Sequence, residues 1–238
     1  MKWSEFFTSS VGKKLVMALT GLFLITFLVV HVGINACIWV PDGGETFNKA
    51  AHFMGTMILI RIMEVGLFVF FIIHIVQAYA LTVKNRRNRK IGYAVNYGNR
   101  GSKWYSRSMG ILGTLILLFL VMHLYHFWTP SRFGGMGSIH ELGTVSYDGK
   151  EYHNLYGEMI KVFTDENYGL LVVVLYVLGC ISLAYHLLHG FQSAFRTMGV
   201  SNSRYVALLR GTGYAFSIIV SLGFAMMPVS IHFGWVTV

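Results

Sequence analysis

Residues 21–35, GLFLITFLVVHVGIN, place a single histidine, His31, deep inside an apolar run. Three later apolar stretches repeat this arrangement, each with its own histidine: VGLFVFFIIHIVQAY (65–79, His74), ILGTLILLFLVMHLYHFW (111–128, His123) and LLVVVLYVLGCISLAYHLLHG (170–190, His186). A titratable ring is costly in hydrocarbon, so inside a membrane span it marks a functional site by default. The four histidines are therefore the first candidates for function.

The composition is typical of a membrane protein. Of the 238 residues, 55% are hydrophobic and 12% are charged, with a mean hydropathy of +0.57, whereas about a quarter of the residues in soluble domains are charged. A spanning helix needs roughly 20 predominantly apolar residues. Five segments qualify, at about 15–40, 57–83, 109–128, 168–195 and 206–235. We predict an all-α integral membrane protein, one transmembrane domain over residues 1–238, with five helices of which the first four form a bundle around the histidines.

The charges indicate how the chain crosses the membrane. Fourteen of the nineteen Lys and Arg residues fall before the first span and in the second and fourth connections, and eight of the ten acids fall in the first and third connections. Positive residues favour the cytoplasmic side. We therefore expect the N-terminus inside and the C-terminus outside, in the cytoplasmic (inner) membrane of a bacterium. The same segregation argues against reading the net charge of +9 as nucleic-acid binding.

The N-terminus is expected to be retained. The first apolar run is too long for the core of a signal peptide and has no small-residue cleavage site.

This topology sorts the four histidines by depth. Spans one and three run outward and carry His31 and His123 towards their outer ends, whereas spans two and four run inward and carry His74 and His186 towards their inner ends. Two histidine pairs at two depths predict two bis-histidine haems, an outer one held by His31 and His123 and an inner one held by His74 and His186. Because the chain has no CxxCH motif, the haems should be of the non-covalent b type. Cys37 and Cys180 are expected to be small packing residues.

Glycines supply a separate check on this prediction. Each of the four spans carries a glycine seven to ten residues before its histidine: Gly21, Gly66, Gly113 and Gly179. At 1.5 Å per residue these offsets are roughly 10–15 Å along a helix, so each glycine lies near the depth of the other histidine pair, where it would leave room for a macrocycle. The alternative is that the glycines allow close helix contact, as in any membrane bundle.

Further polar residues are candidates for the same chemistry. The motifs HLYH and HLLH add His126 and His189, which either make interfacial hydrogen bonds or contact haem propionates or a quinone. Arg61 and Arg107 are further candidates for such contacts. Glu64 is the only acid within a predicted span, so it is either a structural ion partner of Arg61 or a proton carrier for quinone chemistry.

Two connections have distinctive sequences. TVSYDGKEYHNLYG in the third connection is expected to form a turn or short hairpin around Asp148 and Gly149, within an external cap. KNRRNRK at 84–90 either sets the topology and contacts anionic lipid or, with Arg100, Lys103 and Arg107, docks a partner protein.

Taken together, these motifs resemble one family, the single-subunit, two-haem cytochrome b anchors of succinate:quinone oxidoreductases and quinol:fumarate reductases. The resemblance covers nearly the whole chain and is carried by four segments: SSVGKKLVMALTGLFLITFLVVHVGIN (9–35), EVGLFVFFIIHIVQA (64–78), SRSMGILGTLILLFLVMHLYHFW (106–128) and YHLLHGFQSAFRTMG (185–199). It implies that His31, His74, His123 and His186 are the axial ligands.

The resemblance also implies partners that this chain does not contain. These are a flavoprotein with covalent FAD and the dicarboxylate site, and an iron-sulfur subunit on the cytoplasmic face; the electron acceptor would be a membrane quinone, with menaquinone favoured. The chain would then be the membrane subunit of a respiratory enzyme of the tricarboxylic acid cycle, working in the direction of either succinate oxidation or fumarate reduction. The alternatives are a stand-alone two-haem cytochrome b and a haem-free proton-coupled transporter.

Overall fold

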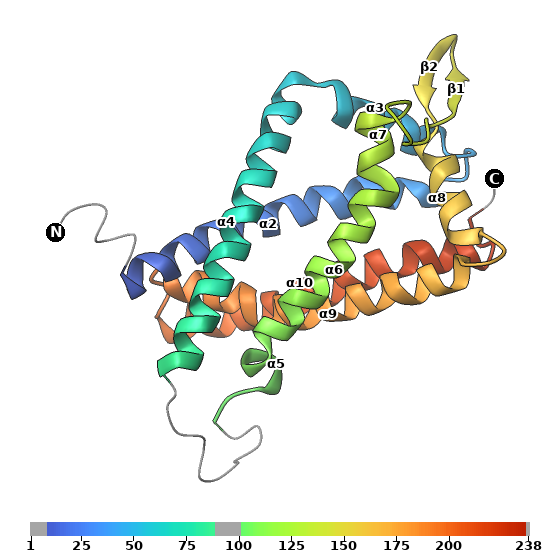
Figure 1. Ribbon diagram of the computed structural model, residues 1–238. Coiled ribbons are helices and arrows are strands. Elements are labelled where there is room, and N and C mark those ends of the chain that lie inside the picture. The colour runs from blue at the N-terminus through green and yellow to red at the C-terminus, as the bar shows by residue number, and fades with distance from the viewer. Residues whose placement is uncertain (1–8, 89–100, 237–238) are drawn as a thin grey trace. The chain divides into compact units, whose positions relative to one another are not determined.

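Long helices dominate the computed structural model, which describes residues 9–88 and 101–236 (Figure 1). Within these ranges five helical stretches are long and apolar enough to cross a membrane: Ser10–Trp39, Ile58–Asn88, Met109–Phe133, Gly169–Thr197 and Ser203–His232. Their bounds lie within about five residues of the predicted spans. The prediction of a five-span, all-α membrane protein is confirmed at this level.

Two of the five stretches combine several elements. The first consists of α2 (Ser10–Asn35) and the 3-10 helix η1 (Ala36–Trp39). The third consists of α6 (Met109–His123), the π-helix η2 (Leu124–Trp128) and α7 (Thr129–Phe133). The remaining three are single helices, α4 (Ile58–Asn88), α9 (Gly169–Thr197) and α10 (Ser203–His232).

Residue contacts divide the chain into two compact units. The first comprises the described residues within 1–28, 64–114 and 183–218, and the second those within 29–63, 115–182 and 219–238. Each of the five long helices contributes residues to both units. His74 and His186 belong to the first unit, and His31 and His123 belong to the second.

The core of the second unit joins the connections to the helices. Buried side chains from η1, α3 (Glu45–Thr56), α8 (Leu155–Thr164), α9, α10 and the segment after α10 form one hydrophobic cluster: Ile38, Phe47, Tyr156, Met159, Phe163, Val173, Tyr176, Met227, Ile231 and Val236. The short helices α3 and α8 lie within the predicted connections and were not expected as elements. Both are strongly amphipathic, which explains how they place one apolar side against this core.

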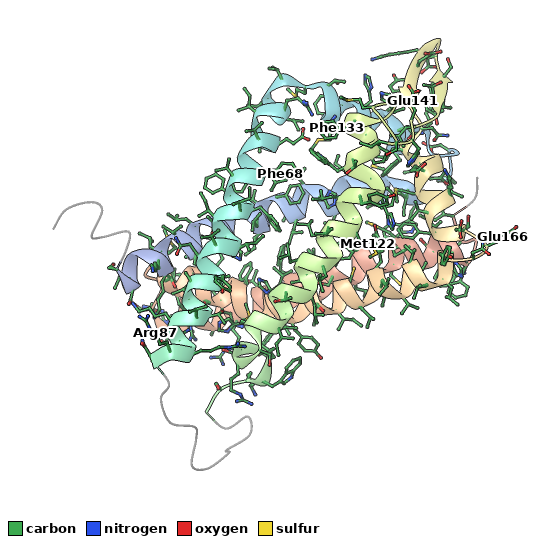
Figure 2. All side chains as sticks on the ribbon, viewed as in Figure 1. Phe68, Arg87, Met122, Phe133, Glu141 and Glu166 are labelled. Atoms are coloured by element: carbon green, nitrogen blue, oxygen red, sulfur yellow. The ribbon has the colours of Figure 1, made fainter. Side chains whose placement is uncertain are left out.

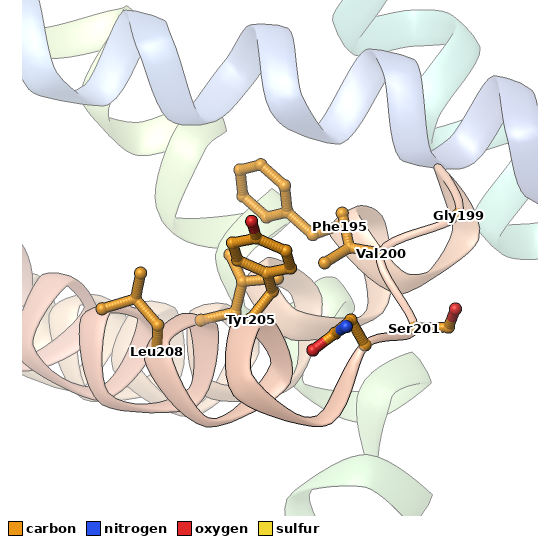
Figure 3. A pocket seen from close by; sticks show the side chains of 8 residues that line it. Phe195, Gly199, Val200, Ser201, Tyr205 and Leu208 are labelled. Carbon is orange, nitrogen blue, oxygen red and sulfur yellow. The ribbon is translucent and has the colours of Figure 1, made fainter.

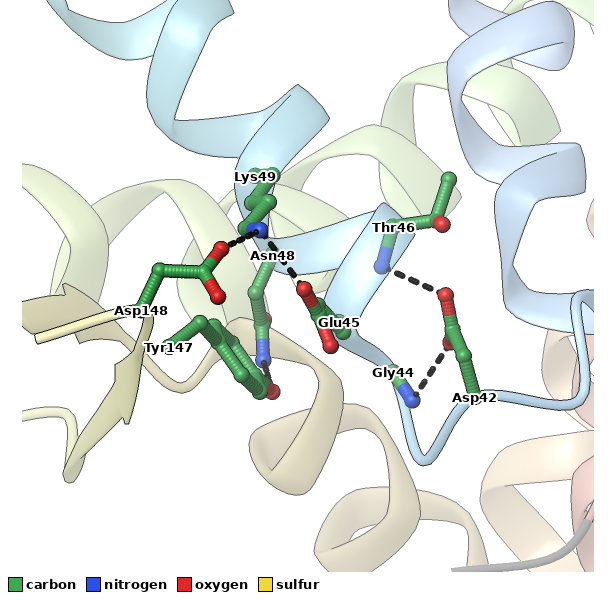
Figure 4. Close-up of polar contacts among 8 residues, drawn as sticks. All are labelled: Asp42, Gly44, Glu45, Thr46, Asn48, Lys49, Tyr147 and Asp148. Carbon is green, nitrogen blue, oxygen red and sulfur yellow. Dashed lines mark hydrogen bonds and ion pairs between the residues drawn. The ribbon is translucent and has the colours of Figure 1, made fainter. Parts of the chain in front are cut away.

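A buried asparagine on α3 joins this helix to the third connection, the predicted external cap. Asn48 on α3 is 1% exposed, and its amide nitrogen donates to Tyr147 Oη at 3.1 Å (Figure 4). The same nitrogen donates to Asn154 Oδ1 at 3.2 Å. The side-chain carbonyl oxygen of Asn48 accepts from the backbone N–H of Tyr156 at 2.9 Å. The Asn48 side chain thus forms hydrogen bonds with β1, with α8 and with the N-cap residue of α8. These bonds make the predicted external cap an ordered substructure.

The predicted hairpin is confirmed. Strands β1 (Thr144–Tyr147) and β2 (Lys150–His153) pair antiparallel around Asp148 and Gly149. These two residues have φ values of +52° and +74°, as a two-residue hairpin turn of type I′ requires. On α3, Lys49 Nζ lies 2.6 Å from Glu45 and 2.7 Å from Asp148, which ties the turn to the helix (Figure 4).

Two contacts join helices of the first unit at the predicted cytoplasmic side. Lys84 near the end of α4 donates to Ser10 Oγ at the start of α2, at 2.6 Å. Trp104 on the short helix α5 (Trp104–Arg107) packs on Tyr185 of α9, with ring centroids 4.6 Å apart. Of the basic residues predicted for this face, Arg89, Lys90 and Arg100 lie outside the described residues.

Candidate functional site

The first unit brings the predicted inner pair together. The ring centroids of His74 on α4 and His186 on α9 are 6.3 Å apart, with 61° between their planes. Histidines 112 positions apart in the sequence therefore face a common point. His189, three residues after His186, has no ring contact of this kind with His74 among the described residues.

The surroundings of His74 indicate which ring nitrogen is available. Thr20 on α2 is 2% exposed, and its hydroxyl donates to the backbone carbonyls of Val16 and Met17 at 2.9 and 3.1 Å. The same oxygen lies 3.1 Å from His74 Nδ1. In the Nδ1–H tautomer of His74 the Thr20 oxygen accepts this hydrogen bond, because its own single proton is directed to the backbone carbonyls. The other nitrogen of the neutral ring, Nε2, is then unprotonated and can bind a metal. Metal-binding histidines commonly donate their second ring N–H to a partner in this way.

The second unit brings the predicted outer pair together. The ring centroids of His31 and His123 are 5.8 Å apart, with 86° between their planes. Asn35 donates to the backbone carbonyl of His31 at 2.8 Å, and its amide nitrogen lies 3.3 Å from His31 Nδ1. Phe224 on α10 also lies against His31, at a centroid distance of 5.5 Å.

Two of the four rings lack the partners that a structural histidine would have. Among the described atoms, the buried Nδ1 atoms of His123 and His186 have no hydrogen-bond partner. A buried polar atom without a partner costs roughly 1–3 kcal/mol. Unlike His74, these two rings therefore have no hydrogen bond at Nδ1 within the described structure that would fix their tautomer.

Two of the four glycines contact the histidines of the inner pair. A Cβ atom on Gly21 would lie 3.7 Å from His74 Cε1, and one on Gly113 would lie 3.8 Å from His186 Cε1. The other two differ. Gly66 has nothing within 4 Å of a Cβ position among the described atoms, and a Cβ on Gly179 would lie 2.6 Å from the ring of Phe119, which is the close helix packing considered as the alternative.

The donor set fits a bis-imidazole haem. A metal–imidazole bond is about 2 Å long, so two rings on opposite sides of one metal ion have centroids roughly 6 Å apart. Both observed pairs match this separation. No group of three or more His, Cys, Asp or Glu side chains suited to a metal occurs among the described residues. A haem iron needs only two ligands from the protein, since the macrocycle provides four.

The secondary candidates have different surroundings. His126 Nδ1 lies 3.0 Å from the hydroxyl of the buried Tyr176, with the two rings nearly parallel at 6°. His189 lines a shallow polar pocket of about 290 Å³ with Gln192, Ser193, Arg196 and Thr197. Arg107 donates to the carbonyl and the hydroxyl of Ser102.

Arg61 and Glu64 both lie on α4, on either side of the boundary between the two units. Arg61 is exposed and Glu64 is half-buried. Each makes interactions within the described structure. Their predicted roles in quinone or proton chemistry remain predictions.

One pocket was not expected from the sequence. It has a volume of about 500 Å³ and lies where α9 turns into α10, with Phe195, Tyr205 and Leu208 among its lining residues (Figure 3). It contains none of the predicted site residues. Thr20 and Tyr176 were also missed, because a threonine or a tyrosine in an apolar helix carries no signal until its partner is known.

Comparison of the chain with protein-family models, curated proteins and solved structures produced no match.

Proposed function

We propose that this chain is a di-haem membrane cytochrome b that carries electrons to or from a membrane quinone. The observation that carries the proposal is the pairing of His31 with His123 and of His74 with His186, at centroid separations of 5.8 and 6.3 Å, each pair within one unit. The family resemblance and the segregated charges support the wider assignment, as the membrane anchor of a succinate dehydrogenase or fumarate reductase.

The chain's residues define what the site would do. When bound, a haem supplies one-electron transfer, tuned by its axial ligands and their hydrogen bonds. His31 with His123 and His74 with His186 would hold the two haems, and two imidazole ligands on each iron would favour electron transfer over oxygen binding. Thr20 would keep His74 in the ligating tautomer, and the apolar surroundings would exclude water. Glu64 is proposed to exchange protons with the quinone.

The wider proposal includes partner subunits on the cytoplasmic face. A flavoprotein with FAD would oxidise succinate or reduce fumarate, and an iron-sulfur subunit would connect it to the inner histidine pair. The support comes from the basic segments of this chain, which the positive-inside rule assigns to that face.

Purification from native membranes tests the proposal. The pyridine haemochromogen assay should give two b-type haems per chain, and a flavoprotein and an iron-sulfur protein should co-purify. A haem-free protein would contradict the proposal and favour the transporter. Two haems without a flavoprotein, in a preparation that retains native lipid, would favour the stand-alone cytochrome.

A further inference from the structure

The second unit contains a buried acid that haem ligation does not use. The side chain of Glu158 on α8 is 9% exposed, and its Oε1 lies 2.9 Å from Nε2 of His140, whose side chain is 48% exposed. Burying a carboxylate is costly unless a partner compensates it. This pair therefore links a buried carboxylate directly to a group that water reaches.

Further polar groups continue inward from this pair. Helix α8, which carries Glu158, packs against η2, which carries His126. His126 Nδ1 in turn lies 3.0 Å from Tyr176 Oη. Tyr176 is 5% exposed, and its ring centroid lies 6.1 Å from that of His123. Four polar side chains thus lead from the surface to a predicted ligand of the outer haem.

The backbone beneath His126 is also unusual. Residues Leu124–Trp128 form a π-helical turn between α6 and α7. π-helical turns inside longer helices are rare and occur frequently at functional sites. This backbone feature is separate from the side-chain contacts, and it includes His126, the hydrogen-bond partner of Tyr176.

We propose that His140 and Glu158 form the outer proton port of the quinone reaction. The inference rests on the proposed function and adds the route by which protons cross the cap. Reduction of a quinone to a quinol takes up two electrons and two protons, and oxidation releases the same number. Each proton would pass between water, His140 and Glu158, and from there towards His126 and Tyr176, with no group consumed.

The charged neighbours leave His140 as the exchange partner of Glu158. The elements packed against α8 carry His126 on η2, His232 on α10, whose Nδ1 lies 2.7 Å from the carbonyl oxygen of Phe163, and, on α3, Glu45, Lys49 and His52; α8 itself carries Lys161. The Lys49 ammonium is already bound by Glu45 and Asp148. The hydrogen bond from His140 is thus the direct connection of Glu158 to the surface.

The first test replaces Glu158 by Gln in the complete complex, which keeps the side-chain shape and removes the exchangeable proton. Both haems and electron transfer to an artificial acceptor at the flavoprotein should be retained, while quinone turnover should fall about tenfold or more. The matched control is Glu166→Gln, the same change at an exposed acid between α8 and α9 (Figure 2). Wild-type quinone turnover in a fully loaded Glu158→Gln complex would overturn the proposal.

A second readout does not depend on activity. The infrared difference spectrum between reduced and oxidised complex should contain a carboxyl band that shifts in D2O, disappears in Glu158→Gln and persists in Glu166→Gln. Persistence of that band in Glu158→Gln would also overturn the proposal.

The exposed end of the port provides a test that avoids the buried site. His140→Ala should slow quinone turnover, and imidazole added at concentrations that leave the haem spectrum unchanged should restore it. A merely structural histidine would not be rescued in this way. Unimpaired turnover in His140→Ala, or a loss that imidazole does not repair, counts against the port. Absence of haem from the wild-type protein would instead refute the proposed function itself.

Discussion

The Thr20 hydroxyl has one proton, and backbone carbonyls of its own helix take it. Thr20→Val should therefore leave His74 Nδ1–H without its acceptor while preserving the side-chain volume. A less basic imidazole stabilises the oxidised iron less, so the midpoint potential of the inner haem should rise, and haem affinity should fall about 10–100-fold. Redox titration of purified protein measures this effect. Thr20→Ser keeps the hydroxyl and should behave as wild type; an equal change in both variants would point to packing instead.

The four deep histidines allow the two haems to be assigned separately. Replacing His31 or His123 by Ala should remove the outer haem, and replacing His74 or His186 should remove the inner one, because each pair meets within one unit. Low-temperature absorbance and redox titration distinguish the two haems. His126→Ala and His189→Ala should retain both haems. If one of these two variants loses a haem while its neighbour three residues earlier is dispensable, the pairing is wrong.

Glu64 is either a structural partner of Arg61 or a proton carrier for the quinone reaction, and one substitution distinguishes the two roles. Glu64→Gln should assemble with both haems and reduce an artificial acceptor at the flavoprotein, yet lose most quinone-coupled activity, because the variant cannot exchange a proton. Steady-state assays with a soluble quinone analogue measure the difference. Full quinone activity in an assembled variant would reduce Glu64 to a structural partner of Arg61.

Among the elements, the β1–β2 hairpin depends most directly on backbone conformation. Gly149 has a φ of +74°, and a Cβ there would meet nothing within 4 Å, so Gly149→Ala introduces backbone strain alone. The left-handed conformation should cost about 1–2 kcal/mol of hairpin stability. Hydrogen exchange over residues 144–153 should become faster. Gly143→Ala, also in open space but without a positive φ, is the control and should leave exchange unchanged.

The same hairpin should respond to acid. The hydrogen bond from Lys49 holds the pKa of Asp148 below its usual range. A carboxyl with a lowered folded-state pKa contributes stability above its unfolded pKa, and that contribution is lost as pH falls through the folded pKa. Asp148→Asn should remove this acid dependence while tolerating the positive φ, because asparagine adopts the left-handed conformation readily.

Elements differ in how far the sequence predicts them. Hydropathy predicted the five spans because a run of about 20 apolar residues has few stable environments outside a membrane. Asp148-Gly149 predicted the hairpin because few residue pairs adopt the two positive φ values of its turn. Helices α3 and α8 were missed because 10–12 residues of mixed polarity carry little signal against a long connection. The π-helical turn has no sequence pattern of its own. Depth predicted which histidines pair, but Thr20, Tyr176 and the His140–Glu158 pair depend on contacts between distant segments.

At the scale of the whole molecule, charge separates the two predicted membrane sides. Arg86 and Arg87 end α4, where both are exposed; Figure 2 labels Arg87 there. Nearby, Lys84 donates a hydrogen bond to Ser10 Oγ, so replacing Lys84 would also disturb the contact between α4 and α2. Arg86 and Arg87 are therefore the described residues best suited to separate partner docking from lipid binding and topology.

Replacing Arg86 and Arg87 together by Gln should weaken attachment of the soluble subunits, so the variant should release them at a lower salt concentration than wild type. The difference in attachment should narrow as salt screens the wild-type ion pairs. Each exposed ion pair contributes only about 0–1 kcal/mol, and salt screens it, so the remaining contacts would hold the wild-type complex at concentrations that strip the variant. Stripping of the flavoprotein from washed membranes, followed as a function of salt, measures the attachment. The control replaces Lys150 and Lys161, exposed residues of the connection assigned to the opposite side, by Gln. If the inner variant retains its partners at every salt concentration while a C-terminal reporter changes side, these arginines orient the chain and do not dock a partner.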